Sequence, residues 1–301
     1  MSGLAIVPGS AHPSLAADIG QIVGAPVVPV QVERFPDGEL SVRLLETVRG
    51  RVAVIVQPTG PPVDTHLVEL LALADACRRS AADRVIAVTP YLGYARGDRR
   101  HGRREPIMAS LAARLIEAAG VSHLIAVDLH APQIEGFFHI PVDDISPFSV
   151  LVDAVRPALP HDVVVVSPDL GRLVLATRVA DELHTDAAVV HKRRLSGADS
   201  RPLQVIGDVR DRACLIVDDM ITTGGTVAGC VDAVLRAGAR PEILVVATHG
   251  LFVAGAEGRL RLASVRGIWV TDTLPQPEVS GPRTVIPIAP LIAEAVRRLE
   301  P

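Results

Sequence analysis

Short, near-continuous runs of branched apolar residues recur along the chain and constrain its fold more than any other feature. The runs are bounded by turn residues and lie at 4–7, 52–56, 84–89, 123–127, 163–166, 187–190, 214–217 and 243–247. A strand with one solvated face alternates apolar and polar residues, whereas a strand covered on both faces is apolar throughout. The runs therefore predict parallel strands buried on both faces of a sheet.

Segments with helical spacing lie between many of these runs. In 66–79, one stripe carries the apolar side chains Leu67, Leu70, Leu71, Ala74 and Cys77. The segments 106–119 and 226–237 both end before a glycine, and Pro106 stands at the expected first helical position of the former. Strands that alternate with helices predict an α/β fold with helices on both faces. We expect 275–287 to be a loop.

The two halves of the sequence share a loose pattern. RVIAVTPYLG (84–93) and VVVVSPDLG (163–171) have the same order of strand, proline, one residue and Leu-Gly. LIAVDLH (124–130) and CLIVDDM (214–220) both continue from a strand into an aspartate. This pattern suggests two similar α/β domains, although any α/β chain yields some matches of this kind.

A cluster of prolines, at positions 147, 157 and 160, marks the expected domain boundary. We predict an N-terminal domain over 1–146 and a C-terminal domain over 147–301. The final helix is a candidate for packing on the N-terminal domain.

Composition excludes several classes of protein. A net charge of -4 and a pI of about 6.2 argue against a dedicated nucleic-acid binder. No run of 18 apolar residues is present, so no membrane span is expected, and the N-terminus carries no signal-peptide pattern. The 3 cysteines have no CxxC spacing and are typical of reduced thiols. The chain is therefore expected to be cytoplasmic.

The segment CLIVDDMITTGGTVAGC (214–230) carries the most chemical information: an apolar strand, two acids, a Thr/Gly loop and a helix. Ligands bind beyond the carboxyl ends of strands in open α/β sheets. The loop offers backbone N–H groups, hydroxyls and a helix N-terminus to a phosphate. Asp218 and Asp219 suit sugar hydroxyls, or a metal that bridges to phosphate. A phosphorylated sugar would use both the acids and the Thr/Gly loop. The alternative interpretation is a strand-to-helix turn that is capped by threonine and has no ligand. The loop is not a P-loop, because GxxxxGK[ST] is absent.

This segment resembles the phosphoribosyl-diphosphate loop of type I phosphoribosyltransferases and of ribose-phosphate diphosphokinases. Further stretches resemble the diphosphokinase family specifically: RFPDGELSVRL (34–44), PYLGYARGDRR (90–100), VDLHAPQIEGFF (127–138), SPDLG (167–171) and HKRR…GDV (191–209). The resemblance implies two similar type I phosphoribosyltransferase-like domains, each a mainly parallel sheet flanked by helices. It also implies transfer of the diphosphoryl group of ATP to the C1 hydroxyl of ribose 5-phosphate, for nucleotide biosynthesis.

The resemblance assigns the ATP contacts. It implies that Phe35 stacks on adenine, with Asp37 and Glu39 accepting hydrogen bonds from the base, and that a neighbouring subunit donates this loop. Arg96 and Arg99 would hold phosphate oxygens, for which guanidinium groups are suited. The alternatives are a satellite core contact for Phe35 and a solvated basic turn for the arginines.

The resemblance also assigns the metal and the catalytic groups. His130, which also contacts ATP, and Asp169 would bind Mg²⁺, a cation that keeps much of its water shell. Lys192 and Arg194 would neutralise charge on the diphosphate in the transition state. Lys192 is the single lysine among 30 basic residues, and a solvated turn would more often carry arginine in such a chain.

The implied ribose 5-phosphate site lies entirely in the Thr/Gly segment. Its members are Asp218, Asp219, Thr222, Thr223, Gly224, Gly225 and Thr226. The chain departs from the commonest family pattern at three positions: Gly97 replaces Gln, His191 replaces Asp, and Thr222 replaces Asp. Thr222 cannot accept a proton at neutral pH, so no general-base role is expected of it.

Two other functions compete with this interpretation. A non-catalytic regulatory subunit would account for the departures, and a phosphoribosyltransferase would account for the Thr/Gly loop alone. The resemblance implies a homo-oligomer, a dimer-based tetramer or hexamer. The charge and the lack of a long apolar run predict no nucleic-acid or membrane partner.

Overall fold

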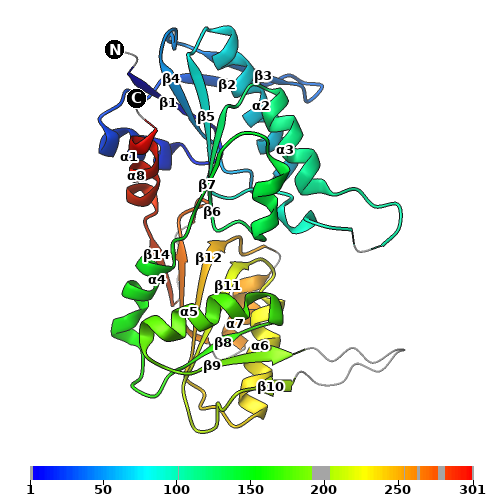
Figure 1. Ribbon diagram of the computed structural model, residues 1–301, viewed down its shortest axis with the longest axis vertical. Helices are drawn as coiled ribbons and strands as arrows, with labels where there is room; N and C mark the ends of the chain where they lie inside the picture. The colour runs from blue at the N-terminus through cyan, green and yellow to red at the C-terminus, as the bar shows by residue number, and fades with distance from the viewer. Residues whose placement is uncertain are drawn as a thin grey trace. The chain divides into compact units, whose positions relative to one another are not determined.

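The computed structural model describes residues 3–100, 102–191, 204–253, 255–262, 265–276 and 282–299. The chain forms two compact units (Figure 1). Unit 1 comprises Met1–Ser146, Thr273–Pro275 and Pro287–Pro301, and unit 2 comprises Pro147–Asp272 and Gln276–Ile286. The described part of the chain has no helix long and apolar enough to cross a membrane.

Unit 1 is built on a five-stranded parallel sheet. In spatial order its strands are β1 (Leu4–Pro8), β4 (Val52–Val56), β5 (Arg84–Thr89), β6 (His123–Val127) and β7 (Val142–Ile145). Its α-helices are α1 (Pro13–Val23), α2 (Val63–Arg79), α3 (Met108–Ala118) and α8 (Ala289–Arg298), with 3₁₀ turns η1 (Ala95–Gly97) and η2 (Pro132–Phe137). The strands β2 (Val30–Arg34) and β3 (Leu40–Leu44) form a separate antiparallel hairpin.

Both faces of this sheet are buried, which explains the unbroken apolar runs. Ala5 and Val7 face a core that includes side chains of α2 and α3. Leu4 and Ile6 face the opposite core, which α1 and α8 complete. Since side chains alternate along a strand, two cores require apolar residues at every position.

Unit 2 contains a seven-stranded sheet that is parallel except at one edge. Its strands, in spatial order, are β10 (Gln204–Ile206), β9 (Ala187–His191), β8 (Val164–Ser167), β11 (Cys214–Ile221), β12 (Ile243–Gly250), β13 (Val265–Thr271) and β14 (Arg283–Ile286). Its α-helices are α4 (Phe148–Val155), α5 (Leu173–Leu183), α6 (Gly225–Arg236) and α7 (Ala256–Leu262), with 3₁₀ turns η3 (Arg156–Ala158) and η4 (Leu170–Arg172). Cores on both faces again bury the strands, so the predicted α/β class with mainly parallel sheets is confirmed.

Two local predictions are wrong. Pro106 precedes the helix, because Ile107 is extended (φ -99°, ψ 94°) and α3 begins at Met108. The segment 275–287 contains the strand β14, which pairs with β13. It lies at the edge of the sheet and is only partly buried, so it lacks the continuous apolar run of the central strands. The predicted glycines after α3 and α6 are confirmed, with φ +105° at Gly120 and +93° at Gly238.

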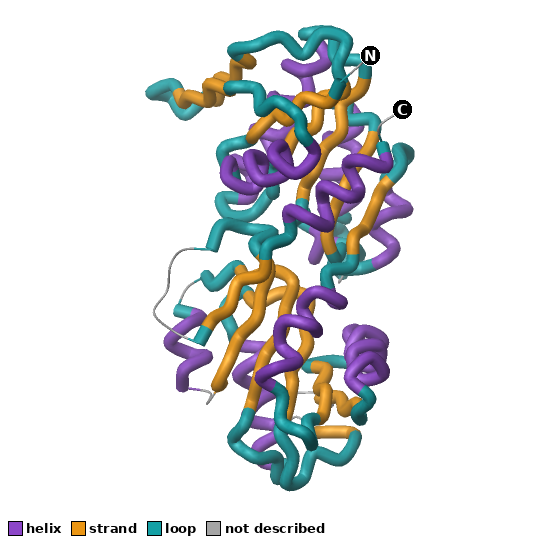
Figure 2. The backbone as a smooth tube through the Cα atoms, turned by 90° about the vertical axis from the view of Figure 1, so that its left-hand side faces the viewer, coloured by secondary structure: helices purple, strands orange, loops and turns teal. Residues whose placement is uncertain are grey.

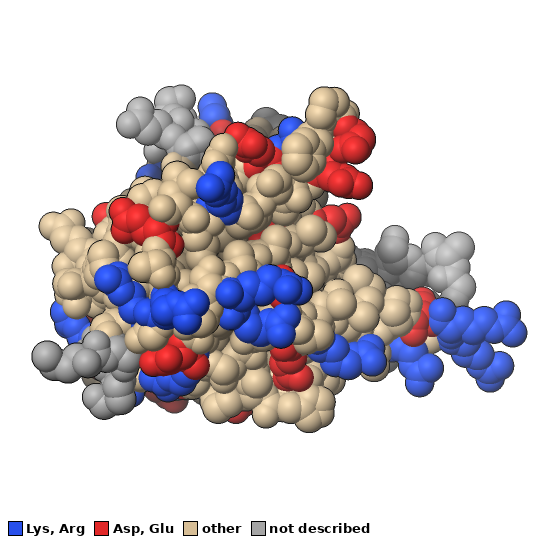
Figure 3. Space-filling view, turned by 90° about the horizontal axis from the view of Figure 1, so that it is seen from above, with Lys and Arg blue, Asp and Glu red and all other residues tan. Residues whose placement is uncertain are grey.

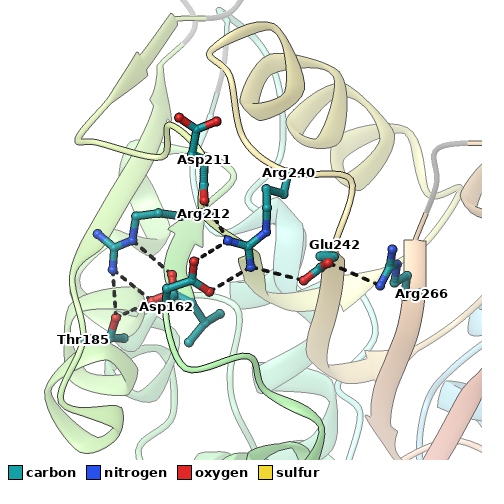
Figure 4. Close-up of polar contacts among 8 residues, drawn as sticks. Asp162, Thr185, Asp211, Arg212, Arg240, Glu242 and Arg266 are labelled. Atoms are coloured by element: carbon teal, nitrogen blue, oxygen red, sulfur yellow. Dashed lines mark hydrogen bonds and ion pairs between the residues drawn. The ribbon is translucent and has the colours of Figure 1, made fainter.

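An ion-pair network lies where the strands of unit 2 begin (Figure 4). Arg240, which precedes β12, donates to both carboxylate oxygens of Asp162, which precedes β8. It also donates to Glu242, with an Nη2–Oε2 distance of 3.2 Å. Arg212, which precedes β11, donates to the Asp162 carbonyl and pairs with Asp186 at 2.6 Å. The network joins neighbouring strands at the edge opposite their carboxyl ends.

We expect Asp162→Asn to lower the melting temperature modestly at pH 7 and not at very low pH. The hydrogen bond from Arg240 lowers the pKa of Asp162 below its ordinary 3.8. The pair therefore stabilises the fold above that value, and its contribution disappears as the pH falls through the lower pKa of the folded state. Thermal melts across this range, with Asp232→Asn as an exposed control, would test this. Equal differences at all pH values would contradict it.

Candidate functional site

The carboxyl edge of the unit 2 sheet gathers most of the predicted sugar-phosphate residues. Asp218 and Asp219 lie within β11, beyond the point where β8 stops pairing with it, and both are buried (7% and 3% exposed). Burial raises the pKa of Asp218 well above its ordinary value, and repulsion from Asp219 adds to this effect. Two adjacent buried carboxyl groups are costly without a partner.

The loop between β11 and α6 has the form of an anion-binding turn. Gly224, at φ +74°, is the residue before α6, and no side chain caps the helix. The alternative of a threonine-capped turn is therefore wrong. Thr223, Gly225 and Thr226 are exposed, and the first N–H groups of a helix have no partner within it. A phosphate can reach these donors.

The segment after β12 holds this loop in place. The Val253 N–H donates to the Thr222 carbonyl at 3.0 Å, and the Arg259 guanidinium donates to the Thr223 carbonyl. A Cβ built on Gly224 would lie 3.1 Å from the Leu260 Cγ. The loop therefore packs closely on α7, and its path leaves little room for another residue at position 224.

Asp169 follows β8 at the same edge of the sheet. Its Oδ1 accepts the N–H groups of Gly171 (2.8 Å) and Arg172 (3.2 Å), and its side chain is exposed. The Arg172 guanidinium forms an ion pair with Asp219. Arg172 thus joins the predicted metal ligand Asp169 to the predicted sugar ligand Asp219.

The catalytic residues predicted from the sequence, Lys192 and Arg194, lie outside the described residues. His191, directly before them, is the last residue of β9. Since β9 pairs in parallel with β8, it ends at the same edge of the sheet as Asp169. The last described residue before Lys192 therefore lies at this edge.

The carboxyl edge of the unit 1 sheet carries His130, which follows β6. The turn into it contains Asp128 at φ +48°, a conformation that is rare outside glycine. The Asp128 N–H donates to the Ile145 carbonyl and the Leu129 N–H donates to Asp144 Oδ1, each at 3.0 Å. The edge strand β7 therefore fixes the backbone that presents His130.

Arg96 and Arg99 follow β5 at this edge, and both are exposed. Between them, buried Asp98 accepts a hydrogen bond of 2.5 Å from Gln133 Nε2. This bond ties the arginine segment to the segment that follows His130. A Cβ on Gly97 would lie 3.0 Å from Met108 Cβ, which gives a packing reason for glycine there.

The basic run continues beyond Arg99 into the loop before α3. Its residues Arg100, Arg103 and Arg104 are also exposed. Figure 3 shows basic side chains gathered in separate groups, one of which protrudes at the right. The near-neutral net charge therefore conceals local basic clusters.

Phe35, Asp37 and Glu39 lie at the tip of the β2–β3 hairpin (Figure 2). Phe35 is 52% exposed. The Glu39 N–H donates to Asp37 Oδ1 at 3.0 Å, and the Phe35 N–H donates to the Glu39 carbonyl at 2.9 Å. Partly buried Val30, Val42 and Leu44 anchor the base of the hairpin on the core. The tip is therefore ordered by its own hydrogen bonds while its aromatic ring stays accessible.

Sequence reasoning missed four residues that hold these segments: Asp98, Asp144, Arg172 and Arg259. Asp98 and Arg172 stand inside or beside quoted motifs, so proximity was a usable signal for them. Asp144 and Arg259 act on segments to which they are not adjacent in sequence. His130 belongs to unit 1 and Asp169 to unit 2, so their shared metal remains a prediction.

Comparison with known proteins gives matches along nearly the whole chain. Residues 4–120 match the N-terminal domain of ribose phosphate pyrophosphokinase, and residues 196–301 match the phosphoribosyl synthetase-associated domain. A ribose-phosphate pyrophosphokinase of Wolinella succinogenes is 39% identical over 99% of this chain and 96% of its own. One of Chromobacterium violaceum is 41% identical over 98% and 91%. A crystal structure of phosphoribosylpyrophosphate synthetase from Mycobacterium smegmatis has a TM-score of 0.92 and 38% identity, covering 99% of this chain and 98% of that one.

Proposed function

Because the chain belongs to the ribose-phosphate pyrophosphokinase family, we propose that it transfers the β,γ-diphosphoryl group of ATP to the C1 hydroxyl of ribose 5-phosphate. The products are phosphoribosyl diphosphate and AMP. The C1 oxygen loses its proton and forms a bond to the β-phosphorus as the bond from that phosphorus to the α,β-bridging oxygen breaks, so AMP leaves. Such reactions depend on positioning and on charge neutralisation more than on covalent catalysis.

The observation that carries the proposal is the edge of unit 2 where an uncapped helix N-terminus follows two buried acids. The donors of residues 222–226 suit the 5-phosphate. The carboxyl groups of Asp218 and Asp219 suit ribose hydroxyls, which donate hydrogen bonds. A phosphorylated sugar needs both features a short distance apart along one chain segment.

For ATP, we assign adenine to Phe35, Asp37 and Glu39, and phosphates to Arg96 and Arg99. All five side chains are exposed. The tip of the hairpin would complete the ATP site of a neighbouring subunit, which makes the active form a homo-oligomer built from dimers. We also assign the chain to the cytoplasm, in keeping with its unpaired, buried cysteines.

The donor set fits Mg²⁺. His130 and Asp169 would hold it, and one carboxylate beside substrate phosphates and water is a common set for this cation. The described residues contain no cluster of three or more metal-ligating side chains, which suits a cation that arrives with the nucleotide better than a closed protein cage. When bound, Mg²⁺ neutralises phosphate charge. Asp169 keeps its orientation without the metal, because two backbone N–H groups hold its Oδ1.

The direct test is product formation by the purified chain. AMP and phosphoribosyl diphosphate should form only when ATP, ribose 5-phosphate and Mg²⁺ are present together. Binding of both substrates without product would instead indicate a regulatory subunit, which should become active only with a paralogue. Release of diphosphate that depends on a nucleobase would indicate a phosphoribosyltransferase.

We expect Phe35→Ala to raise the KM for ATP about tenfold, since stacking of a base on an aromatic ring contributes about 1–3 kcal/mol. The KM for ribose 5-phosphate should not change. Leu45→Ala is the matched control, because Leu45 follows the same hairpin and is similarly exposed (54%). Steady-state kinetics on the three proteins would check this, and equal effects of the two substitutions would refute the adenine assignment.

A further inference from the structure

Arg172 connects two functional segments of unit 2 through opposite ends of the residue. Its backbone N–H donates to Asp169 Oδ1 at 3.2 Å. Its guanidinium pairs with Asp219, and the two side chains are only 14% and 4% exposed. The ion pair is therefore largely shielded from water, so the attraction between its charges is screened less than in an exposed pair.

The acid pair beside Arg172 is stabilised by positive charge. Asp218 and Asp219 are consecutive and buried, and the Asp219 N–H donates to Asp218 Oδ1 at 2.9 Å. Like charges in such a place are relieved by uptake of a proton or by a nearby cation. A divalent cation is one solution, and a fixed guanidinium is another. In this chain Arg172 occupies one oxygen of Asp219, Oδ2.

A fixed guanidinium changes what the acid pair can bind. It holds the Asp219 carboxylate in one orientation and lowers the net negative charge that an incoming phosphorylated sugar meets. The sugar hydroxyls then find oriented acceptors without a metal ion to organise them. Guanidinium groups suit this role because they stay charged and bind carboxylates with defined geometry.

We propose that Arg172 is a positioning residue that serves as the built-in counter-cation of Asp218 and Asp219, so that this chain binds ribose 5-phosphate without a divalent cation. The inference rests on the proposed function, since it names that function's sugar substrate. Under this inference, any Mg²⁺ requirement of the reaction comes from binding of the nucleotide.

Calorimetric titration of the full chain with ribose 5-phosphate, without ATP, tests this. The wild type should bind equally well in EDTA and in Mg²⁺. Arg172→Gln should bind about tenfold more weakly in EDTA, because a charged hydrogen-bond partner is lost. Mg²⁺ should restore part of that loss by neutralising Asp219. Arg172→Lys should fall between the two, and Arg178→Gln, which removes an exposed arginine of α5, should match the wild type.

Two results would overturn the inference: a wild type that binds the sugar only with Mg²⁺, or an Arg172→Gln variant that binds like the wild type in EDTA. If circular dichroism shows that Arg172→Gln is unfolded, the wild-type comparison and Arg172→Lys decide. Failure of the proposed function looks different, because then no form binds ribose 5-phosphate and no AMP is produced. Product formation together with Mg²⁺-dependent sugar binding would remove this inference alone.

Discussion

Replacing Lys192 by alanine is expected to lower kcat about a hundredfold or more, since removal of one preorganised charge contact costs about 3–4 kcal/mol in the transition state. The negative charge on the diphosphoryl group must be neutralised as it leaves the α-phosphate. A lysine ammonium is a compact point charge suited to this task. The KM values should change much less than kcat, because the contact acts mainly in the transition state.

Lys192→Arg tests whether a positive charge at this position is sufficient or whether the compact ammonium group is also needed. It keeps a positive group at the same position, so its kcat should lie between those of the wild type and Lys192→Ala. Arg210→Ala serves as the matched control, because Arg210 is an exposed basic residue of the same unit. Circular dichroism should show all variants folded. An unchanged kcat for Lys192→Ala would refute the catalytic assignment.

Eight strands were predictable because burial on both faces imposes an unbroken apolar pattern, whereas β2, β3, β7, β10 and β13 were not predicted. The strand β4, for example, has the predicted bounds Val52–Val56. The strand β14 lacked that pattern, because an edge strand is partly exposed, and it was missed. The start of α3 was misplaced because Ile107 is extended, so the helix begins only at Met108.

The candidate site likewise has features that the sequence predicts and features that only the folded sheet reveals. The placement of Asp169, Asp218 and Asp219 at one edge of the sheet was predictable because they follow predicted strands, and parallel strands bring their carboxyl ends to one edge. The ion pair between Arg172 and Asp219 could not be read from the sequence, because it depends on β8 lying beside β11. Strand order is a property of the folded sheet, and the chain order of the strands does not determine it.

The two glycines of the Thr/Gly loop differ in whether their position tolerates a side chain. Substitution by alanine should therefore have different effects at the two positions. Gly224 has φ +74°, and its Cβ would lie 3.1 Å from the Leu260 Cγ. Gly225 has no positive φ, and the nearest atom to its Cβ would be Thr223 Oγ1 at 3.5 Å. The first position requires a left-handed conformation, whereas the second opens the helix α6.

Gly224→Ala should therefore lower both the melting temperature and the affinity for ribose 5-phosphate. A left-handed conformation costs an L-residue about 1–2 kcal/mol. The loop can avoid that cost only by moving, and such movement misaligns its N–H donors. A charge-assisted hydrogen bond to the phosphate is then weakened as well, so we expect the affinity for ribose 5-phosphate to fall about thirtyfold. Gly225→Ala should instead raise the melting temperature, because alanine favours the helix. Thermal melts and sugar titrations of both variants would check the opposite signs. The Gly224→Ala variant could instead be as stable as the wild type and bind the sugar as tightly. That result would mean that the loop is free to move, and it would contradict the idea that preorganised N–H donors bind the phosphate.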